Sequence, residues 1–144
     1  MVMKRVLYIF AVAALAMGAN ACAVPDKEFV HDDATISAIY MATTQKDATG
    51  KEKSISFPGV IDQDAGTIVF SVTKDKRKDI DLDAVKIRAN VGFDAYVKVT
   101  REGGKDVDRT LSGIHDITEG IDLTVTAKMT GTTKDYHLTA KYLN

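Results

Sequence analysis

The sequence has no tryptophan, a single cysteine and only three histidines. With one cysteine no disulfide can form within the chain, so its stability must come from the burial of apolar side chains. Without tryptophan a sugar ring would have to stack on a tyrosine. His31, His115 and His137 are far apart in sequence, in a predicted tether, a predicted loop and the polar face of a predicted strand, and no pair has the spacing of metal ligands. We therefore predict no metal site and no cofactor.

The chain also lacks an excess of charge of one sign. It has 19 Lys and Arg residues against 20 Asp and Glu residues, a net charge of −1, which becomes −3 without residues 1–21. A chain with this balance lacks the excess of positive charge that nucleic-acid binding needs, so we exclude nucleic acid as a partner. The mixed charge run over residues 74–79 is interpreted as a solvated loop, with contact to anionic headgroups or a partner as the alternative.

Motifs for catalysis are missing as well. No serine has the setting of a nucleophile elbow such as G-x-S-x-G, although paired carboxylates for glycoside hydrolysis stay open because their spacing is spatial. Residues 79–83 begin like an EF-hand loop, but Ala84 stands where a glycine is needed and Asn90 where a bidentate glutamate is needed. An irregular calcium site remains an alternative to solvated carboxylates. We predict that the protein is not an enzyme.

The one long apolar run lies near the start of the chain. It covers 13 residues, from Val6 to Gly18, after Lys4 and Arg5. A helix needs roughly 20 apolar residues to span a bilayer, so this run is too short, and its basic start is typical of an export signal. We predict a signal peptide over residues 1–21.

The signal ends in Ala19-Asn20-Ala21-Cys22, which resembles the lipobox of bacterial lipoproteins. The resemblance implies that Cys22 is diacylated on sulfur, becomes the mature N-terminus and attaches the protein to a membrane. The alternative is cleavage after Ala21 by the general signal peptidase, because the site also reads A-x-A. The lipoprotein interpretation is favoured because a leftover thiol in an exported domain would invite unwanted pairing.

Residues 22–33 contain a proline and several acids without apolar periodicity, and are predicted to form a tether. Acidic residues soon after a lipid-carrying cysteine resemble signals that send some Gram-negative lipoproteins to the outer face of the outer membrane. The predicted location is therefore outside the cytoplasm, anchored by lipid in the outer membrane and exposed at the cell surface.

From Thr35 onward the apolar residues recur with a period of two, as in strands with one buried face. Turn signals with glycine separate the alternating segments, and no window of ten residues has helical spacing. Residues 34–144 are accordingly predicted to form one all-β domain, an antiparallel immunoglobulin-like β-sandwich of seven or eight strands. A strand starting at Ser54 is expected to stop at Pro58-Gly59, and hairpins are expected at residues 62–66, 102–105 and 130–133.

Alternation also divides the tyrosines of the strands. Tyr40, Tyr136 and Tyr142 fall on the apolar parity and are expected inside, whereas Tyr96 falls on the polar parity. Tyr96 is therefore the candidate ligand contact. Its alternative role is packing against a neighbouring strand.

Two hairpin patterns, over residues 59–72 and 122–140, together with the lipobox resemble a family. It comprises small Ig-like lipoprotein domains of unknown function from the envelopes of glycan-foraging Gram-negative gut bacteria. The resemblance covers nearly the whole mature chain, with Met129-Thr130 as a departure where relatives usually carry an acid. It implies a surface binding or scaffolding role and supplies no catalytic residues.

The sequence thus predicts a lipid-anchored, noncatalytic binding or assembly module of the cell envelope, part of surface glycan-capture or adhesion machinery. Its partner would be an envelope protein, held through an exposed sheet edge or loop tips. A direct glycan-binding protein is the first alternative, and a small hydrolase is the second.

Overall fold

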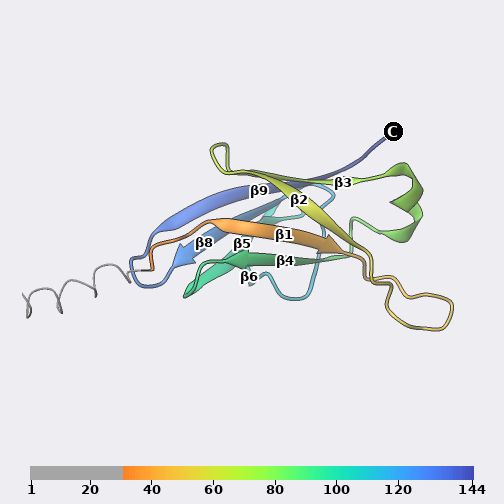
Figure 1. Cartoon of the computed structure of the whole chain (residues 1–144), viewed down its shortest axis with the longest axis horizontal. Helices are drawn as coiled ribbons and strands as arrows, with labels where there is room; N and C mark the ends of the chain where they lie inside the picture. Colours follow the sequence, from red (N-terminus) through yellow and green to blue (C-terminus); the bar gives the residue numbers. More distant parts are fainter. Residues whose placement is uncertain (1–30) are drawn as a thin grey trace, which may run out of the picture. The chain divides into compact units, whose positions relative to one another are not determined.

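The computed structural model describes residues 31–144, which form one compact unit (Figure 1). The predictions on residues 1–21, on Cys22 and on most of the tether lie outside the described residues. Hydrogen bonds join nine strands into one sheet of order β6-β5-β8-β9-β3-β2-β1-β4-β7, and a short 3-10 helix, η1, follows β3. The elements are β1 (Ile36–Ala42), β2 (Ser56–Asp62), β3 (Thr67–Val72), η1 (Lys74–Asp79), β4 (Val85–Val91), β5 (Ala95–Glu102), β6 (Lys105–Thr110), β7 (Ile114–His115), β8 (Ile121–Ala127) and β9 (Thr133–Tyr142).

The sheet curls where β2 changes partner along its length. Its first residues pair with β1, with Pro58 opposite Tyr40, and its later residues pair with β3, beginning with Gly59. A Cβ atom on Gly59 would lie 2.7 Å from side-chain carbons of Ile39 and Ile68, so only glycine lets the strand pass this close to the core. The expectation that this strand stops at Pro58-Gly59 is wrong, because the strand exchanges partners there and continues.

The all-β prediction is confirmed, and residues 31–144 contain nine strands in place of seven or eight. Because one hydrogen-bonded sheet contains all nine, the two separate layers of an immunoglobulin-like sandwich are not confirmed. The three expected hairpins are present as β2–β3, β5–β6 and β8–β9. All strand pairs are antiparallel except β3 and β9, which run parallel and correct the prediction of a wholly antiparallel sheet.

The concave side of the curl holds a single apolar core that both halves of the sheet supply. Burial of each large apolar side chain contributes about 1.5–3 kcal/mol. The largest fully buried apolar side chains are Tyr136, Phe70, Ile36, Ile39, Met41, Ile68, Ile80, Ile117, Ile121, Leu123 and Leu138.

The charged segment predicted as a solvated loop forms η1, which has no buried residue. Within residues 31–144 no helix has the length and apolar character needed to cross a membrane.

A β-bulge in β1 reverses which of its side chains face the core. The register against β4 shifts between Ile36 and Ala38, so that Ser37 is an extra residue. Ile36 is buried before the bulge, and Ile39 is buried after it. A bulge inserts one residue into one strand and so exchanges the two faces beyond it. Tyr40 is therefore turned to the outer face, where it is 42% exposed, and the expectation that it lies inside is wrong.

A second bulge, in β5, turns a charged side chain inward. The register against β8 shifts between Val99 and Arg101, with Thr100 as the extra residue. Val99 is buried, and beyond the bulge the side chain of Glu102 turns inward and is only 14% exposed. The bulge thus brings a carboxylate to the edge of the core.

Candidate ligand-binding groove

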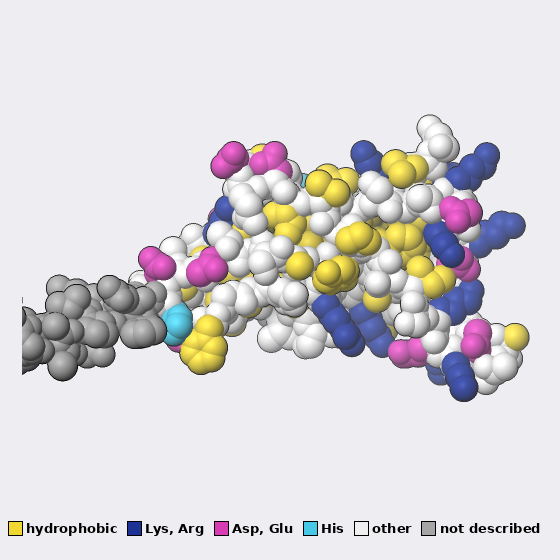
Figure 2. Space-filling model, in the orientation of Figure 1, with side chains coloured by type: hydrophobic (Ala, Val, Ile, Leu, Met, Phe, Trp, Pro, Cys, Tyr) yellow, Lys and Arg dark blue, Asp and Glu magenta, His cyan; other side chains and the backbone are white. Residues whose placement is uncertain are grey.

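A groove of about 420 Å3 lies on the outer face of the sheet, between strands β1, β2 and β4 and the loop of residues 43–55. Its lining includes the last residues of β1 and part of the loop that follows β1, which lies at the right of Figure 1. Lys and Arg side chains gather toward this end of the molecule, which also carries η1 (right in Figure 2). The groove is lined by Tyr40, Ala42, Thr43, Glu52, Lys53, Ser54, Ile55, Ser56, Lys86 and Arg88.

Three neighbouring strands place one side chain each in a row across this face. Tyr40 on β1 is the register partner of Pro58 on β2 and of Arg88 on β4. Directly opposite residues on one face of an antiparallel pair have Cβ atoms about 4.5–5.5 Å apart. The exposed ring of Tyr40 is consequently flanked by a proline ring and a guanidinium group. This row offers a flat apolar surface with a cation beside it.

The groove carries more positive than negative charge. Three of its lining residues are cationic and only Glu52 is anionic. Nζ of Lys86 lies 3.1 Å from Glu52, and Nζ of Lys53 lies 3.1 Å from Asp79. Arg88, in contrast, forms neither an ion pair nor a side-chain hydrogen bond with any residue of 31–144. Its five N–H donors are available to a ligand.

The loop over the groove is held by hydrogen bonds of its own. The N–H of Thr43 donates to the carbonyl of Ile55 at 3.0 Å, and its hydroxyl group donates to the carbonyl of Lys53 at 2.9 Å. At the tip, the hydroxyl and N–H of Thr49 donate to Oδ1 of Asp47 at 2.6 and 2.8 Å. These bonds, the Thr49 hydroxyl foremost, hold the pKa of Asp47 below its ordinary value of 3.8. The loop is therefore an ordered wall of the groove.

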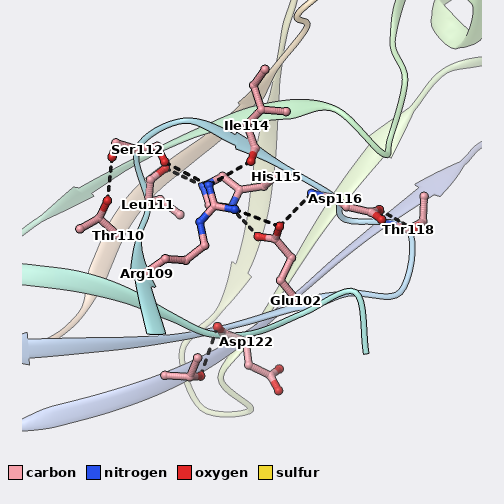
Figure 3. Close-up of polar contacts among 11 residues, drawn as sticks. Glu102, Arg109, Thr110, Leu111, Ser112, Ile114, His115, Asp116, Thr118 and Asp122 are labelled. Carbon is pink, nitrogen blue, oxygen red and sulfur yellow. Dashed lines mark hydrogen bonds and ion pairs between the residues drawn. The ribbon is translucent and has the colours of Figure 1, made fainter. Parts of the chain in front are cut away.

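A second polar cluster, formed by Glu102, Arg109 and His115, lies between β5, β6 and β7 (Figure 3). The prediction that His115 lies in a loop is wrong, because His115 belongs to β7 and its side chain is fully buried. Its Nδ1 lies 2.5 Å from Oε1 of Glu102, and its Nε2 lies 2.8 Å from the carbonyl oxygen of Leu111. A carbonyl only accepts, so Nε2 carries a proton. Both ring nitrogens are occupied, which leaves none to act as a general base.

Arg109 completes this cluster. Its Nη1 lies 3.3 Å from Oε2 of Glu102, and its Nη2 donates to the carbonyl oxygen of Ile114 at 3.0 Å. The guanidinium group thus bridges the inward carboxylate and the backbone of β7. We interpret the cluster as a structural clamp that holds the segment after β6 against the β5–β6 hairpin.

The third histidine forms a similar pair in a different environment. Nδ1 of His137 on β9 lies 2.5 Å from Oδ1 of Asp122 on β8, and the two side chains are 52% and 39% exposed. Next to it the hydroxyl group of Thr124 donates to Asp135 at 2.6 Å. Together these contacts form a polar ladder across two strands. His137 lies on the exposed face that its strand parity predicted.

The histidines do not meet in space. Among the residues that the structure describes, no group of three His, Cys, Asp or Glu side chains is arranged to hold a metal ion. His31 contacts the ring of Phe93, with centroids 4.9 Å apart, and each of the other two histidines is paired with a carboxylate.

Strand parity predicts the exposure of some tyrosines correctly and of others wrongly. Tyr96 is 38% exposed on β5, as its parity predicts, and Nζ of Lys128 lies 5.7 Å from its ring centroid. It lies outside the groove, and its role as a ligand contact stays a prediction. Tyr142 is 40% exposed near the chain end, which contradicts its expected burial. The sequence did not identify Tyr40 as an exposed residue of the groove, because the strand parity changes at the bulge in β1.

The chain has little similarity to known proteins. No protein-family model matches the sequence, and no curated protein is significantly similar to it. Among solved structures, the crystal structure of a "putative secreted protein" from Bacteroides fragilis aligns with 80% of this chain and 99% of that chain, at 22% identity and a TM-score of 0.48. A likeness of this extent carries no argument about function.

Proposed function

We propose that this chain is an exported lipoprotein, held in the outer membrane by lipid on Cys22, whose described unit is a noncatalytic binding module. Its ligand is a saccharide that lies in the groove. The observation that carries the proposal is the exposed ring of Tyr40, which the bulge in β1 turns into a groove lined with hydroxyl groups and cations. Sugar rings present apolar faces that stack on aromatic rings, while their hydroxyl groups bond to polar side chains.

The groove is favoured over a sheet edge as the binding surface. The edge strand β6 carries charges, and ion pairs of 3.0 and 3.1 Å link Asp108 to Lys98 and Asp106 to Arg101 on β5. Charged side chains on an edge oppose the addition of another strand. A protein partner held by strand addition therefore receives less support than a ligand on the face of the sheet.

His115, the histidine with the most buried side chain among the described residues, does not support a catalytic function. A general base needs a free nitrogen within hydrogen-bond reach of its substrate. Both nitrogens of His115 are taken up by the clamp. The noncatalytic proposal is therefore retained over the hydrolase alternative.

The test uses the chain from Ala23 onward, which includes the whole compact unit, on a glycan array and in pull-downs from detergent-solubilised envelopes. Ser56→Trp fills the groove from an exposed position, and Thr133→Trp places the same bulk at an exposed position on β9. We expect saccharide binding that Ser56→Trp abolishes and Thr133→Trp preserves. Binding that survives Ser56→Trp, or a reproducible protein partner with no saccharide, would contradict the proposal. Turnover of a bound saccharide would contradict its noncatalytic part.

A further inference from the structure

We infer that the saccharide in the groove carries a negative charge, a carboxylate or sulfate group, which binds Arg88 while the sugar ring stacks on Tyr40. The inference rests on the proposed function and adds the chemical class of its ligand. It follows from the position of one unpaired cation relative to one exposed ring.

Arg88 is suited to an anion in this place. It is exposed, has no ion pair within residues 31–144, and is the direct register partner of Tyr40. A guanidinium group binds carboxylate or sulfate oxygens through two parallel hydrogen bonds. A ring on Tyr40 that bears an acidic substituent can therefore satisfy both residues at once. A neutral sugar would leave the guanidinium without an anion.

A second cation extends the positive surface along β4. Lys86 lies two residues before Arg88 on the same face of the strand, a distance of about 7 Å along it. Its partner Glu52 is 63% exposed at the rim of the groove. Exposed ion pairs contribute little to stability, so a stronger anion can replace Glu52 as the partner of Lys86 at little cost. The positive surface is therefore long enough to meet more than one acidic group.

The position on a sheet face favours a saccharide over an acidic peptide. Extended peptides commonly add to a free strand edge, where the backbone supplies the hydrogen bonds. The floor of the groove is β1, and Tyr40 is paired with β2 on one side and β4 on the other. The ligand must then be recognised by side chains, and the exposed residues Ser54 and Ser56 add hydroxyl groups to the lining of the groove that contains the aromatic ring. That combination matches a sugar.

The experiment compares matched ligands on the chain from Ala23 onward. An array of uronic, sialic and sulfated oligosaccharides is probed beside their neutral counterparts, such as oligogalacturonate beside its methyl ester, with polyglutamate as the acidic peptide. The tightest ligand is then titrated by calorimetry. We expect acidic saccharides to bind at least tenfold more tightly than the neutral forms, because hydrogen bonds between a guanidinium group and an anion are charge-assisted; tenfold corresponds to about 1.4 kcal/mol.

Two variants and two controls assign the roles. Arg88→Gln should weaken the acidic ligand roughly tenfold or more and remove the preference over the neutral form, whereas Tyr40→Ala should weaken both forms. Arg101→Gln and Tyr142→Ala remove exposed side chains that do not line the groove and should leave binding unchanged. Circular dichroism establishes that every variant is folded.

The outcomes separate this inference from the proposed function. Neutral saccharides that bind the groove as tightly as acidic ones would overturn the charge assignment and leave the proposed function standing. The same holds if Arg88→Gln keeps full affinity for the acidic ligand. Polyglutamate binding as tightly as the sugars would identify an acidic peptide and overturn the inference. If no saccharide binds at all, the proposed function fails with it.

Discussion

The hydroxyl group of Tyr136 donates a hydrogen bond of 2.6 Å to Oε1 of Gln63, which is 73 residues away in the sequence. The same hydroxyl group accepts a hydrogen bond of 3.0 Å from the N–H of Ile36, and the side-chain amide of Gln63 donates to the carbonyl of Ile36 at 2.8 Å. Three residues thus form a closed ring of hydrogen bonds. It connects β9, the turn between β2 and β3, and the start of β1.

Tyr136→Phe removes the hydroxyl group at the centre of this ring. We expect the free energy of unfolding to fall by about 1–3 kcal/mol, because the buried N–H of Ile36 loses its acceptor. Urea denaturation followed by circular dichroism measures the loss. Tyr142→Phe is the matched control at an exposed position, and it should change the stability by no more than about 0.5 kcal/mol. Equal effects of the two variants would refute the role of the ring.

Leu123→Asp introduces a charge at a fully buried position of β8. An unpaired carboxylate in an apolar core costs several kcal/mol, which is comparable to the whole stability of a small domain. We expect the variant to be unfolded at 25 °C by circular dichroism. Thr133→Asp, at the exposed start of β9, should remain folded. A cooperative, native-like unfolding transition in Leu123→Asp would contradict the assigned core.

The two histidine–carboxylate pairs offer a comparison of burial at equal distance, since both have contacts of 2.5 Å. Removal of one partner from a buried pair typically costs 3–5 kcal/mol, whereas an exposed pair contributes about 0–1 kcal/mol. We expect His115→Ala to destabilise the protein by about 3 kcal/mol and His137→Ala by less than about 1 kcal/mol. Urea denaturation of both variants at pH 7 provides the measurement. Similar losses would mean that the cluster around Glu102 is not a clamp.

Asp47 should contribute to the acid sensitivity of the loop at the groove. Its pKa in the folded chain lies below 3.8 because the hydroxyl group of Thr49 bonds the charged form. As the pH falls, the unfolded chain takes up this proton first, so the contribution is complete above about pH 4 and is lost at lower pH. NMR titration of the Asp47 carboxyl carbon should give a midpoint below 3.8, and Thr49→Val should move that midpoint upward. An unchanged midpoint in the variant would contradict the assigned cause.

Membrane attachment through Cys22 is tested on the full chain in a Gram-negative host. Mass spectrometry of the mature protein should find a diacylated N-terminal cysteine. Cys22→Ala should release the protein from membranes after a high-salt wash, because no lipid then holds it. An unmodified chain that begins at Cys22, or a Cys22→Ala variant that stays bound, would exclude the anchor.

Local alternation was sufficient to predict the regular strands. The sequence predicts a hairpin at residues 130–133, and the structure contains β8 and β9 on either side of this turn, which includes Gly131. Turn residues and a period of two are local properties of a sequence. The all-β class and the hairpins follow from them directly.

Pairing between distant strands could not be predicted in this way. The parallel contact of β3 with β9 and the change of partner in β2 depend on which apolar faces meet after the chain has curled. The groove depends on the same non-local information. The polar parity of Lys86 and Arg88 was visible in the sequence, but only the register of β4 against β1 places Arg88 beside Tyr40.

The extra residue Ser37 separates the place of a side chain in the sequence from the face of the sheet on which it lies. Deleting Ser37 would leave Ile36 opposite Val91 and Ala38 opposite Asn90 with no extra residue between them, so β1 would become a regular strand and Tyr40 would stay on the outer face. The shortened strand would therefore keep the aromatic ring of the groove. In related chains that are one residue shorter at this position, simple alternation from the buried Ile36 would identify the aromatic position directly, whereas in this chain the bulge conceals it.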